Sequence, residues 1–216
     1  GRLSLTASGQ SQAVEGQVCI TASDATAAYL LPPVLKRIRE IAPGIEIEVA
    51  PSNALRDLRR READIAIRHV RPDQPDIVAK LIRETSAHLY AASAYLERYG
   101  RPKVARDLDD AHFIGFDRSD RLLSGLNARG LALTKANFRL VSDSSVTAWE
   151  MVKQGLGIGI MAKDIADITP EVECVLPDLE PFPVPVWLAT HRELRTSRRI
   201  RLVFDVLAQA LGGSWP

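Results

Sequence analysis

The stretch SDATAAYLLPPVL, residues 23–35, directly follows the apolar segment VCITA, residues 18–22. The apolar segment predicts a strand, the small polar residues after it predict a turn, and the turn opens an amphipathic helix. At such a helix start, backbone N–H groups and short hydroxyls point at one spot, which suits a small anionic ligand. The stretch therefore predicts the first unit of an α/β fold, with a ligand site at the turn.

The alternation of strands and helices continues along the chain. Apolar residues at helical spacing form one face from residue 27 to residue 41, and Pro32 and Pro33 predict that the regular helix starts near them, after a looser turn. Further strands are expected at residues 45–49, 64–68, 78–82, 88–91, 113–116, 138–141, 158–161 and 185–189. Further helices are expected at residues 52–61, 93–99, 145–155 and 197–211, capped by Ser52 or Asn53, Ser93, residues 142–145 and Ser197.

Length and composition limit the class of protein. The 216 residues allow one large domain or two small ones, and 46% hydrophobic and 25% charged residues are typical of a globular protein. The net charge of +1 gives no overall field that would attract nucleic acid or a membrane. Cys19 and Cys174 are far apart and outside any C-x-x-C pair, which favours a reducing compartment and thiols that are buried or idle.

Motifs for catalysis or for a cofactor are missing from the sequence. The run GIGIMA, residues 157–162, formally fits a dinucleotide fingerprint, but it follows a helix and enters a strand, so its glycines indicate a tight helix-to-strand turn. The four histidines show no metal-ligand spacing, and there is no G-x-S-x-G, H-E-x-x-H or phosphate-loop motif. We therefore predict no enzyme, no cofactor and no metal site.

From about residue 17 to residue 211, the chain resembles the effector-binding domain of LysR-type transcriptional regulators. The resemblance rests on the order and spacing of several segments: residues 18–21, 30–35, 43–47, 55–67, 141–143, 152–160 and 196–204. The family's N-terminal winged helix-turn-helix is not expected in this sequence, and residues 1–16 are predicted to be the remnant of a linker.

The resemblance implies a two-lobed fold of the type 2 periplasmic-binding-protein class, a clamshell of two Rossmann-like subdomains joined by two crossover segments. Subdomain I is expected at residues 17–89 and 190–211, subdomain II at residues 90–189, and a C-terminal tail at residues 212–216. A small effector is expected in the cleft between the lobes, with an organic acid favoured.

Turn residues of both subdomains make up the expected effector site. These residues are Ser23, Asp24, Ala25, Thr26, Ser52, Asn53, Arg68, His69, Phe116, Asp117, Ser119, Ser142, Asp143 and Ser144. Ser52 and Ser144 are equally well explained as helix N-caps. Arg68 and His69 have a second interpretation as surface residues at a strand end, and Asp24 would repel a carboxylate unless it points away.

The resemblance also implies an antiparallel homodimer of this domain and a tetramer of the full-length regulator. The expected interface residues are Val34, Lys36, Arg37, Ile41, Trp149 and Lys153, with a core position as the alternative for Trp149. DNA would bind only through the N-terminal domain, and the regulator would be cytoplasmic with no membrane partner. The alternative function is a solute-binding protein of a transporter, which shares the two-lobed fold; an enzyme on this scaffold ranks last.

Overall fold

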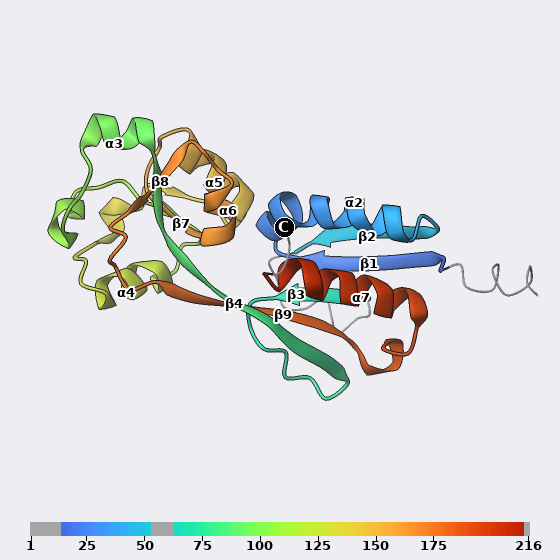
Figure 1. Cartoon of the computed structure of the whole chain (residues 1–216). Coiled ribbons are helices and arrows are strands. Elements are labelled where there is room, and N and C mark those ends of the chain that lie inside the picture. The colour runs from blue at the N-terminus through green and yellow to red at the C-terminus, as the bar shows by residue number, and fades with distance from the viewer. Residues whose placement is uncertain (1–13, 53–62, 214–216) are drawn as a thin grey trace, which may run out of the picture. The chain divides into compact units, whose positions relative to one another are not determined.

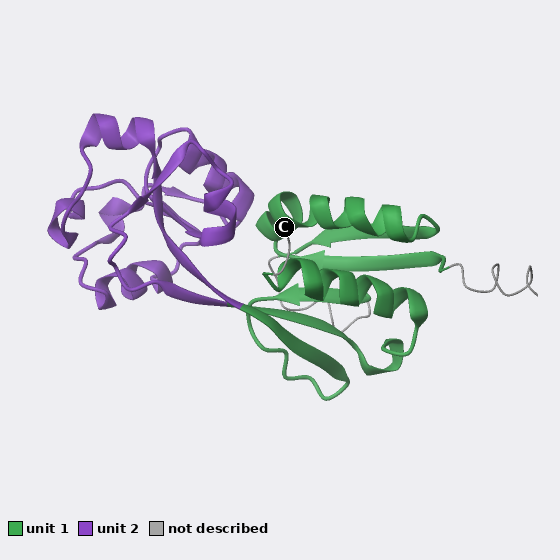
Figure 2. Ribbon diagram, in the orientation of Figure 1, with its two compact units in different colours: residues 1–83, 185–216 green, residues 84–184 purple. Residues whose placement is uncertain are grey.

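The computed structural model describes residues 14–52 and 63–213, and the chain divides into two compact units (Figures 1 and 2). Unit 1 comprises residues 1–83 and 185–216, and unit 2 comprises residues 84–184. Two long strands, β4 (Ile77–Ala92) and β9 (Phe182–His191), each run from one unit into the other. The predicted α/β fold, with two lobes joined by two crossing segments, is confirmed. The predicted subdomain boundaries fall inside these two strands.

Unit 1 is a sheet covered by helices. Its elements are β1 (Gly16–Ala22), the π-helical turn η1 (Thr26–Leu30), α2 (Leu31–Ile41), β2 (Ile45–Pro51), β3 (Ile65–Arg68), the 3-10 turn η5 (Arg192–Leu194) and α7 (Arg198–Leu211). The strands lie in the order β2-β1-β3-β9, with β1 parallel to both of its neighbours and β3 antiparallel to β9. The looser turn predicted before Pro32 is the π-helical turn, and the regular helix begins at Leu31.

The core of unit 1 joins β1, β3 and β9 to α2 and α7. Val18 and Ile20 of β1 pack with Leu31, Val34 and Ile38 of α2 in one apolar cluster. The helix expected at residues 197–211 is α7, whose three buried residues are Ile200, Val203 and Leu207, and Ser197 holds the N-cap position. Phe204 and Leu211 are half-buried at the edge of this cluster.

Unit 2 contains shorter elements. They are α3 (Ser93–Tyr99), η3 (Ala105–Leu108), β5 (Ile114–Gly115), α4 (Arg121–Ala128), η4 (Lys135–Asn137), β6 (Leu140–Val141), α5 (Ser145–Lys153), β7 (Gly159–Ala162), α6 (Lys163–Asp167) and β8 (Val172–Val175). β4 pairs antiparallel with β7 and β8, whereas β5 pairs parallel with β6. A bridge between Phe113 and Ile158 joins the segment before β5 to the segment before β7.

Several sequence expectations for unit 2 were wrong in detail. Residues 78–82 and 88–91 belong to one continuous strand, β4, because the polar segment between them contains no proline or glycine that would interrupt the ladder. Ser93 is the first residue of α3, and Ala92 occupies the N-cap position. The strands expected at residues 113–116 and 138–141 are only two residues long. The helices α4 and α6 and the strand β8 were not predicted.

The two cysteines differ from each other in their exposure. Cys19 is partly buried in β1, whereas Cys174 is exposed in β8. Partial burial is the main cause that raises the pKa of each thiol, which keeps both in the protonated form.

Among the helices that the structure describes, none has the length and apolar character that crossing a bilayer requires.

The ion pair between Arg101 and Glu173 predicts an acid-sensitive contact in unit 2. The Arg101 guanidinium donates to both carboxylate oxygens, at 3.1 and 2.8 Å, and this pairing lowers the pKa of Glu173 to about 2. Because the folded-state pKa is lowered, the stabilisation is present above about pH 4.5 and is lost as the pH falls toward 2. Urea unfolding measures how far the free energy of unfolding drops as the pH is lowered from 4.5 toward 2, and this drop should be smaller for Glu173→Gln than for the parent. Glu171→Gln is the matched control, and its drop should equal that of the parent. Equal drops in all three proteins would contradict the assignment.

Candidate functional site

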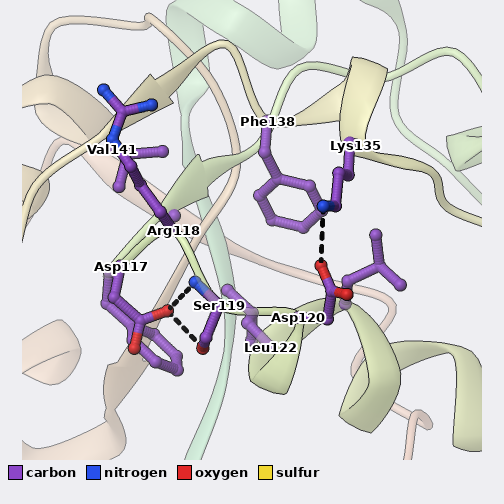
Figure 3. Close-up of a pocket in the computed structure, with 11 residues that line it drawn as sticks. Asp117, Arg118, Ser119, Asp120, Leu122, Lys135, Phe138 and Val141 are labelled. Carbon is purple, nitrogen blue, oxygen red and sulfur yellow. Dashed lines mark hydrogen bonds and ion pairs between the residues drawn. The ribbon is translucent and has the colours of Figure 1, made fainter.

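A pocket of about 250 Å³ opens in unit 2 beside the loop that follows β5, and we name it the β5 pocket (Figure 3). Its lining comes from the end of β5, the loop, the start of α4, η4 and β6. The residues that line it are Gly115, Phe116, Asp117, Arg118, Ser119, Asp120, Leu122, Leu123, Lys135, Phe138 and Val141.

Hydrogen bonds within the loop fix one wall of the β5 pocket. Asp117 Oδ1 accepts the Ser119 N–H at 2.9 Å and the Ser119 hydroxyl at 2.5 Å, as Figure 3 shows. Ser119 Oγ in turn accepts the Arg121 N–H at 3.3 Å, at the first residue of α4. This Asx-type turn explains why a short polar sequence can hold a defined shape after a two-residue strand. Asp117 and Ser119 therefore shape the pocket as well as line it.

Two phenylalanines supply the apolar part of the pocket. Phe138 packs against Phe113 of the core, with ring centroids 5.5 Å apart, and the Arg121 guanidinium lies 5.6 Å from the centre of the Phe116 ring. Gly115 allows the close approach of the surrounding chain, because a Cβ there would lie 3.3 Å from Val141 Cγ2 and 3.4 Å from Phe138 Cδ1. The pocket can thus accept a flat apolar group between side chains that the core holds in place.

Charged side chains of both signs stand at the pocket. Lys135 Nζ lies 3.8 Å from Asp120 Oδ1, and their side chains are 80% and 58% exposed (Figure 3). An exposed pair at this distance contributes at most about 1 kcal/mol, so Lys135 can exchange Asp120 for the carboxylate of a ligand at little cost. Arg118 adds a second cation to the lining and Asp117 a second carboxylate, and Asp117 already accepts both hydrogen bonds from Ser119. An apolar body with one anionic end matches this arrangement.

The turn after β1 does not offer the donors that the sequence predicted. Asp24 Oδ1 accepts the Ala25 N–H at 2.8 Å, Ser23 Oγ accepts the Thr26 N–H at 3.3 Å, and the Ser23 carbonyl accepts the Ala27 N–H at 2.9 Å. Ala25 and Thr26 are themselves buried. The N–H groups of residues 25–27 therefore already have partners within the turn, and the effector site predicted there stays a prediction. Ser23 and Asp24 remain half-exposed.

The other predicted residues of unit 1 lie at strand ends. Ser52 is half-buried directly after β2, and its N–H donates to the Ala22 carbonyl at 2.7 Å. Arg68 is only 6% exposed at the end of β3, which excludes its interpretation as a surface residue. His69 is half-buried, with Nδ1 3.1 Å from the Pro185 carbonyl. Asn53 and the helix expected at residues 52–61 lie outside the described residues, apart from Ser52 itself.

Residues 142–144 follow β6, next to the Val141 wall of the β5 pocket, but they do not line it. Ser144 is the N-cap of α5, since its Oγ accepts the Thr147 N–H at 3.1 Å, and Ser142 Oγ accepts the Ser144 N–H at 3.2 Å. The N-cap interpretation of Ser144 is confirmed. Asp143 is exposed.

The β5 pocket thus contains Phe116, Asp117 and Ser119 from the predicted set, together with residues that were missed. Lys135 and Phe138 are the important omissions. The sequence offered a reason to consider Phe138, because this residue belongs to a segment predicted to be a strand. Lys135 lies in the turn η4, which was not predicted and in which Thr134 Oγ1 accepts the Ala136 N–H. In residues 14–52 and 63–213, no three His, Cys, Asp or Glu side chains are grouped as a metal ion requires.

Two of the residues expected at a dimer interface are buried within their own units. Val34 is 3% exposed in the core of unit 1, and Trp149 is 1% exposed in unit 2, where its Nε1 donates to Thr169 Oγ1 at 3.3 Å. Packing within the chain uses both side chains, so neither is available to a second copy. Lys36, Arg37 and Ile41 are exposed on α2, and Lys153 lies at the end of α5.

Comparison with known proteins identifies relatives of this chain. The model of the LysR substrate binding domain matches residues 11–212. The HTH-type transcriptional regulator CrgA of Neisseria meningitidis is 22% identical over 207 residues, which cover 86% of this chain and 64% of CrgA. An uncharacterized HTH-type transcriptional regulator of Haemophilus influenzae is 25% identical over 154 residues, which cover 70% of this chain and 54% of that protein. The chain therefore spans about half to two thirds of the length of these relatives.

Solved structures show the same fold. The regulatory domain of CrgA from Neisseria meningitidis, described as a LysR-type transcriptional regulator, superposes with a TM-score of 0.80 at 19% identity, covering 92% of this chain and all of that domain. The full-length virulence activator AphB of Vibrio cholerae superposes with a TM-score of 0.72 at 20% identity, covering 96% of this chain and 73% of AphB. The match of the family model across nearly the whole chain shows that the chain belongs to the family of LysR substrate binding domains.

Proposed function

We propose that this chain is the ligand-sensing regulatory domain of a LysR-type transcriptional regulator and that it binds a small organic acid in the β5 pocket. The observation that carries the ligand class is the combination of Phe116 and Phe138 with the cations Arg118 and Lys135 in one cavity. The relatives named as HTH-type regulators support the regulatory role. Neither they nor the similar structures favour a transporter component.

The proposed mode of action needs no catalysis. A ligand that binds one conformation of the domain more tightly shifts the population toward it, and the regulator transmits that shift to a DNA-binding part outside this domain. The same proposal includes self-association of the domain. The contact uses the exposed residues of α2, which are Lys36, Arg37 and Ile41, together with Lys153. A cytoplasmic location follows from contact with DNA. The rest of the predicted effector set stays a prediction: Ser23, Asp24, Ala25, Thr26, Ser52, Asn53, Arg68, His69, Ser142, Asp143 and Ser144.

The test is a calorimetric titration of the 216-residue chain with benzoate, phenylacetate and 3-phenylpropionate, each compared with its neutral amide. A carboxylate should bind more tightly than its amide, because only the acid can pair with Lys135. Lys135→Ala should weaken the acid about 3- to 10-fold and leave the amide unchanged, consistent with one solvent-exposed charge interaction.

Lys103→Ala is the matched control, since Lys103 is an exposed lysine of unit 2 that does not line the β5 pocket. It should not change the affinity for any acid. Two outcomes would contradict the proposed anion site. The acid could bind equally well to the parent and to Lys135→Ala, or the acids and their amides could bind with equal affinity. In that outcome the family membership would stand and the ligand site would have to lie elsewhere.

A further inference from the structure

A second pocket of unit 2, of about 410 Å³, is formed by α3, the segment that follows it and the residues before β5, and we name it the α3 pocket. It has no lining residue in common with the β5 pocket. Its volume lies in the range of about 300–1,000 Å³ that is usual for small-molecule sites. None of the residues predicted as effector contacts lines it, so it needs a separate explanation.

Three rings that contact one another form one wall of the α3 pocket. Tyr95 and Tyr99 have centroids 4.7 Å apart, and the His112 ring lies 5.3 Å from Tyr99 and 6.2 Å from Tyr95. Tyr95 is 4% exposed, and its hydroxyl accepts the His112 N–H at 3.1 Å, which anchors the wall to the backbone. Tyr99 is 52% exposed. A buried tyrosine therefore holds a solvent-accessible aromatic surface in place.

The aromatic wall already attracts a cation. The guanidinium of Arg98 lies 5.1 Å from the centre of the Tyr99 ring, within the distance at which a positive charge interacts with an aromatic face. Burial is the main cause that raises the pKa of Tyr95, so its phenol stays neutral and the wall gains no negative charge from it. Arg98 is exposed and does not itself line the α3 pocket.

The charges of the lining favour a positive ligand. The one arginine that lines the pocket, Arg101, is paired with both carboxylate oxygens of Glu173, which does not line it. The two acidic lining residues are Asp107, whose Oδ2 accepts the Lys103 and Val104 N–H groups at 2.9 and 3.1 Å, and Asp110, which is exposed. Those backbone hydrogen bonds lower the pKa of Asp107 and hold its carboxylate in place. After the Arg101 pair is counted, Asp107 and Asp110 leave the described lining with a negative charge, and the nearby cations are Arg98 at the Tyr99 ring and Lys103 and Arg106 beside Asp107.

We infer that the α3 pocket is a second ligand site, which takes a small organic cation with a planar apolar body. The ring of such a ligand packs against Tyr99 and His112, and its ammonium group faces Asp107 and Asp110. The lining of the β5 pocket holds two cations, Arg118 and Lys135, beside two carboxylates, Asp117 and Asp120, so it lacks the excess of negative charge that the α3 pocket offers to a cation.

The experiment titrates the 216-residue chain, labelled with ¹⁵N, with 2-phenylethylammonium and with its matched anion 3-phenylpropionate. The cation is expected to shift the amide signals of residues 95–112 and to leave those of residues 115–123 unchanged. Tyr99→Ala should weaken the cation about 5-fold or more, and Asp110→Asn about 3-fold. The effect of Asp110→Asn should fall in 0.5 M NaCl, whereas that of Tyr99→Ala should persist, because salt screens the exposed charge.

Tyr99 and Asp110 are both exposed, although Tyr99→Ala also removes the ring contact with the buried Tyr95, and Lys135→Ala serves as the control in the other pocket. It should leave the affinity for the cation unchanged. Three outcomes would overturn the assignment. The cation and the anion could bind at residues 95–112 with equal affinity, the affinity for the cation could be unchanged in Tyr99→Ala and Asp110→Asn, or the cation could fail to bind at 10 mM. Because these readouts do not depend on the β5 pocket, failure here is distinguishable from failure of the proposed acid site.

Discussion

Trp149→Ala is expected to destabilise unit 2 by about 3–5 kcal/mol, the largest effect of any substitution considered for this chain. Trp149 is 1% exposed, and its ring meets that of Tyr90 edge-on, with centroids 5.9 Å apart. Its Nε1 donates to Thr169 Oγ1, which donates to the Ile165 carbonyl at 2.7 Å. The indole thereby connects α5 with β4 and α6, and alanine would leave a cavity among all three.

The measurement is urea unfolding monitored by circular dichroism, with Trp149→Phe as the matched variant. Phenylalanine retains most of the buried ring and loses the hydrogen bond to Thr169, so it should cost only about 1–2 kcal/mol. A near-native stability of Trp149→Ala would show that this side chain is not part of the core. It would also return Trp149 to the list of residues that a second copy can contact.

Gly157→Ala is expected to cost about 1–3 kcal/mol, because the added methyl group meets backbone rather than a flexible side chain. A Cβ at residue 157 would lie 2.8 Å from the His112 carbonyl oxygen. That oxygen accepts the Ile158 N–H at 2.8 Å, and the Ile158 carbonyl accepts the Ile114 N–H at the same distance. The substitution therefore forces apart the two segments whose bridge positions β5.

The effect of Gly157→Ala should extend to ligand binding, since β5 carries the loop that lines the β5 pocket. We expect a lower urea midpoint together with weaker binding of the acid identified by titration. The control is Leu156→Ala at the neighbouring residue, which is 50% exposed and should change the stability by about 0.5 kcal/mol or less. Equal stabilities of the two variants would contradict the close approach of these segments.

The first elements of unit 1 could be predicted because each has a complete local pattern. The strand before Ser23, the helix that starts at the two prolines and the alternating strand from Ile45 are recognisable from neighbouring residues alone. β4 was predicted as two strands because residues 83–86 are polar or charged, whereas in the structure the strand continues through them and β4 as a whole pairs with β9, β7 and β8. α4 was missed since its sequence contains a serine and a glycine in mid-helix, and packing of Leu122 and Leu126 compensates for them.

The candidate site was predictable where one turn determines it and not where the tertiary structure assembles it. Phe116, Asp117 and Ser119 come from a single loop, so the order of elements placed them in one site. Lys135 and Phe138 reach the same pocket through the parallel pairing of β5 with β6, which is not visible in local sequence. At Ser23, the sequence predicted the turn but not that its own side chains would cap the backbone donors.

Binding of an organic acid in the β5 pocket can be located residue by residue. The experiment records ¹H–¹⁵N spectra of the labelled 216-residue chain during titration with the acids that calorimetry identifies. We predict saturable shifts for residues 115–123 and 135–141, which disappear for the neutral amides and shrink in Lys135→Ala. Shifts that saturate only at other residues, or no saturable shift with any aromatic or aliphatic carboxylate up to 10 mM, would rule out the β5 pocket as an acid site.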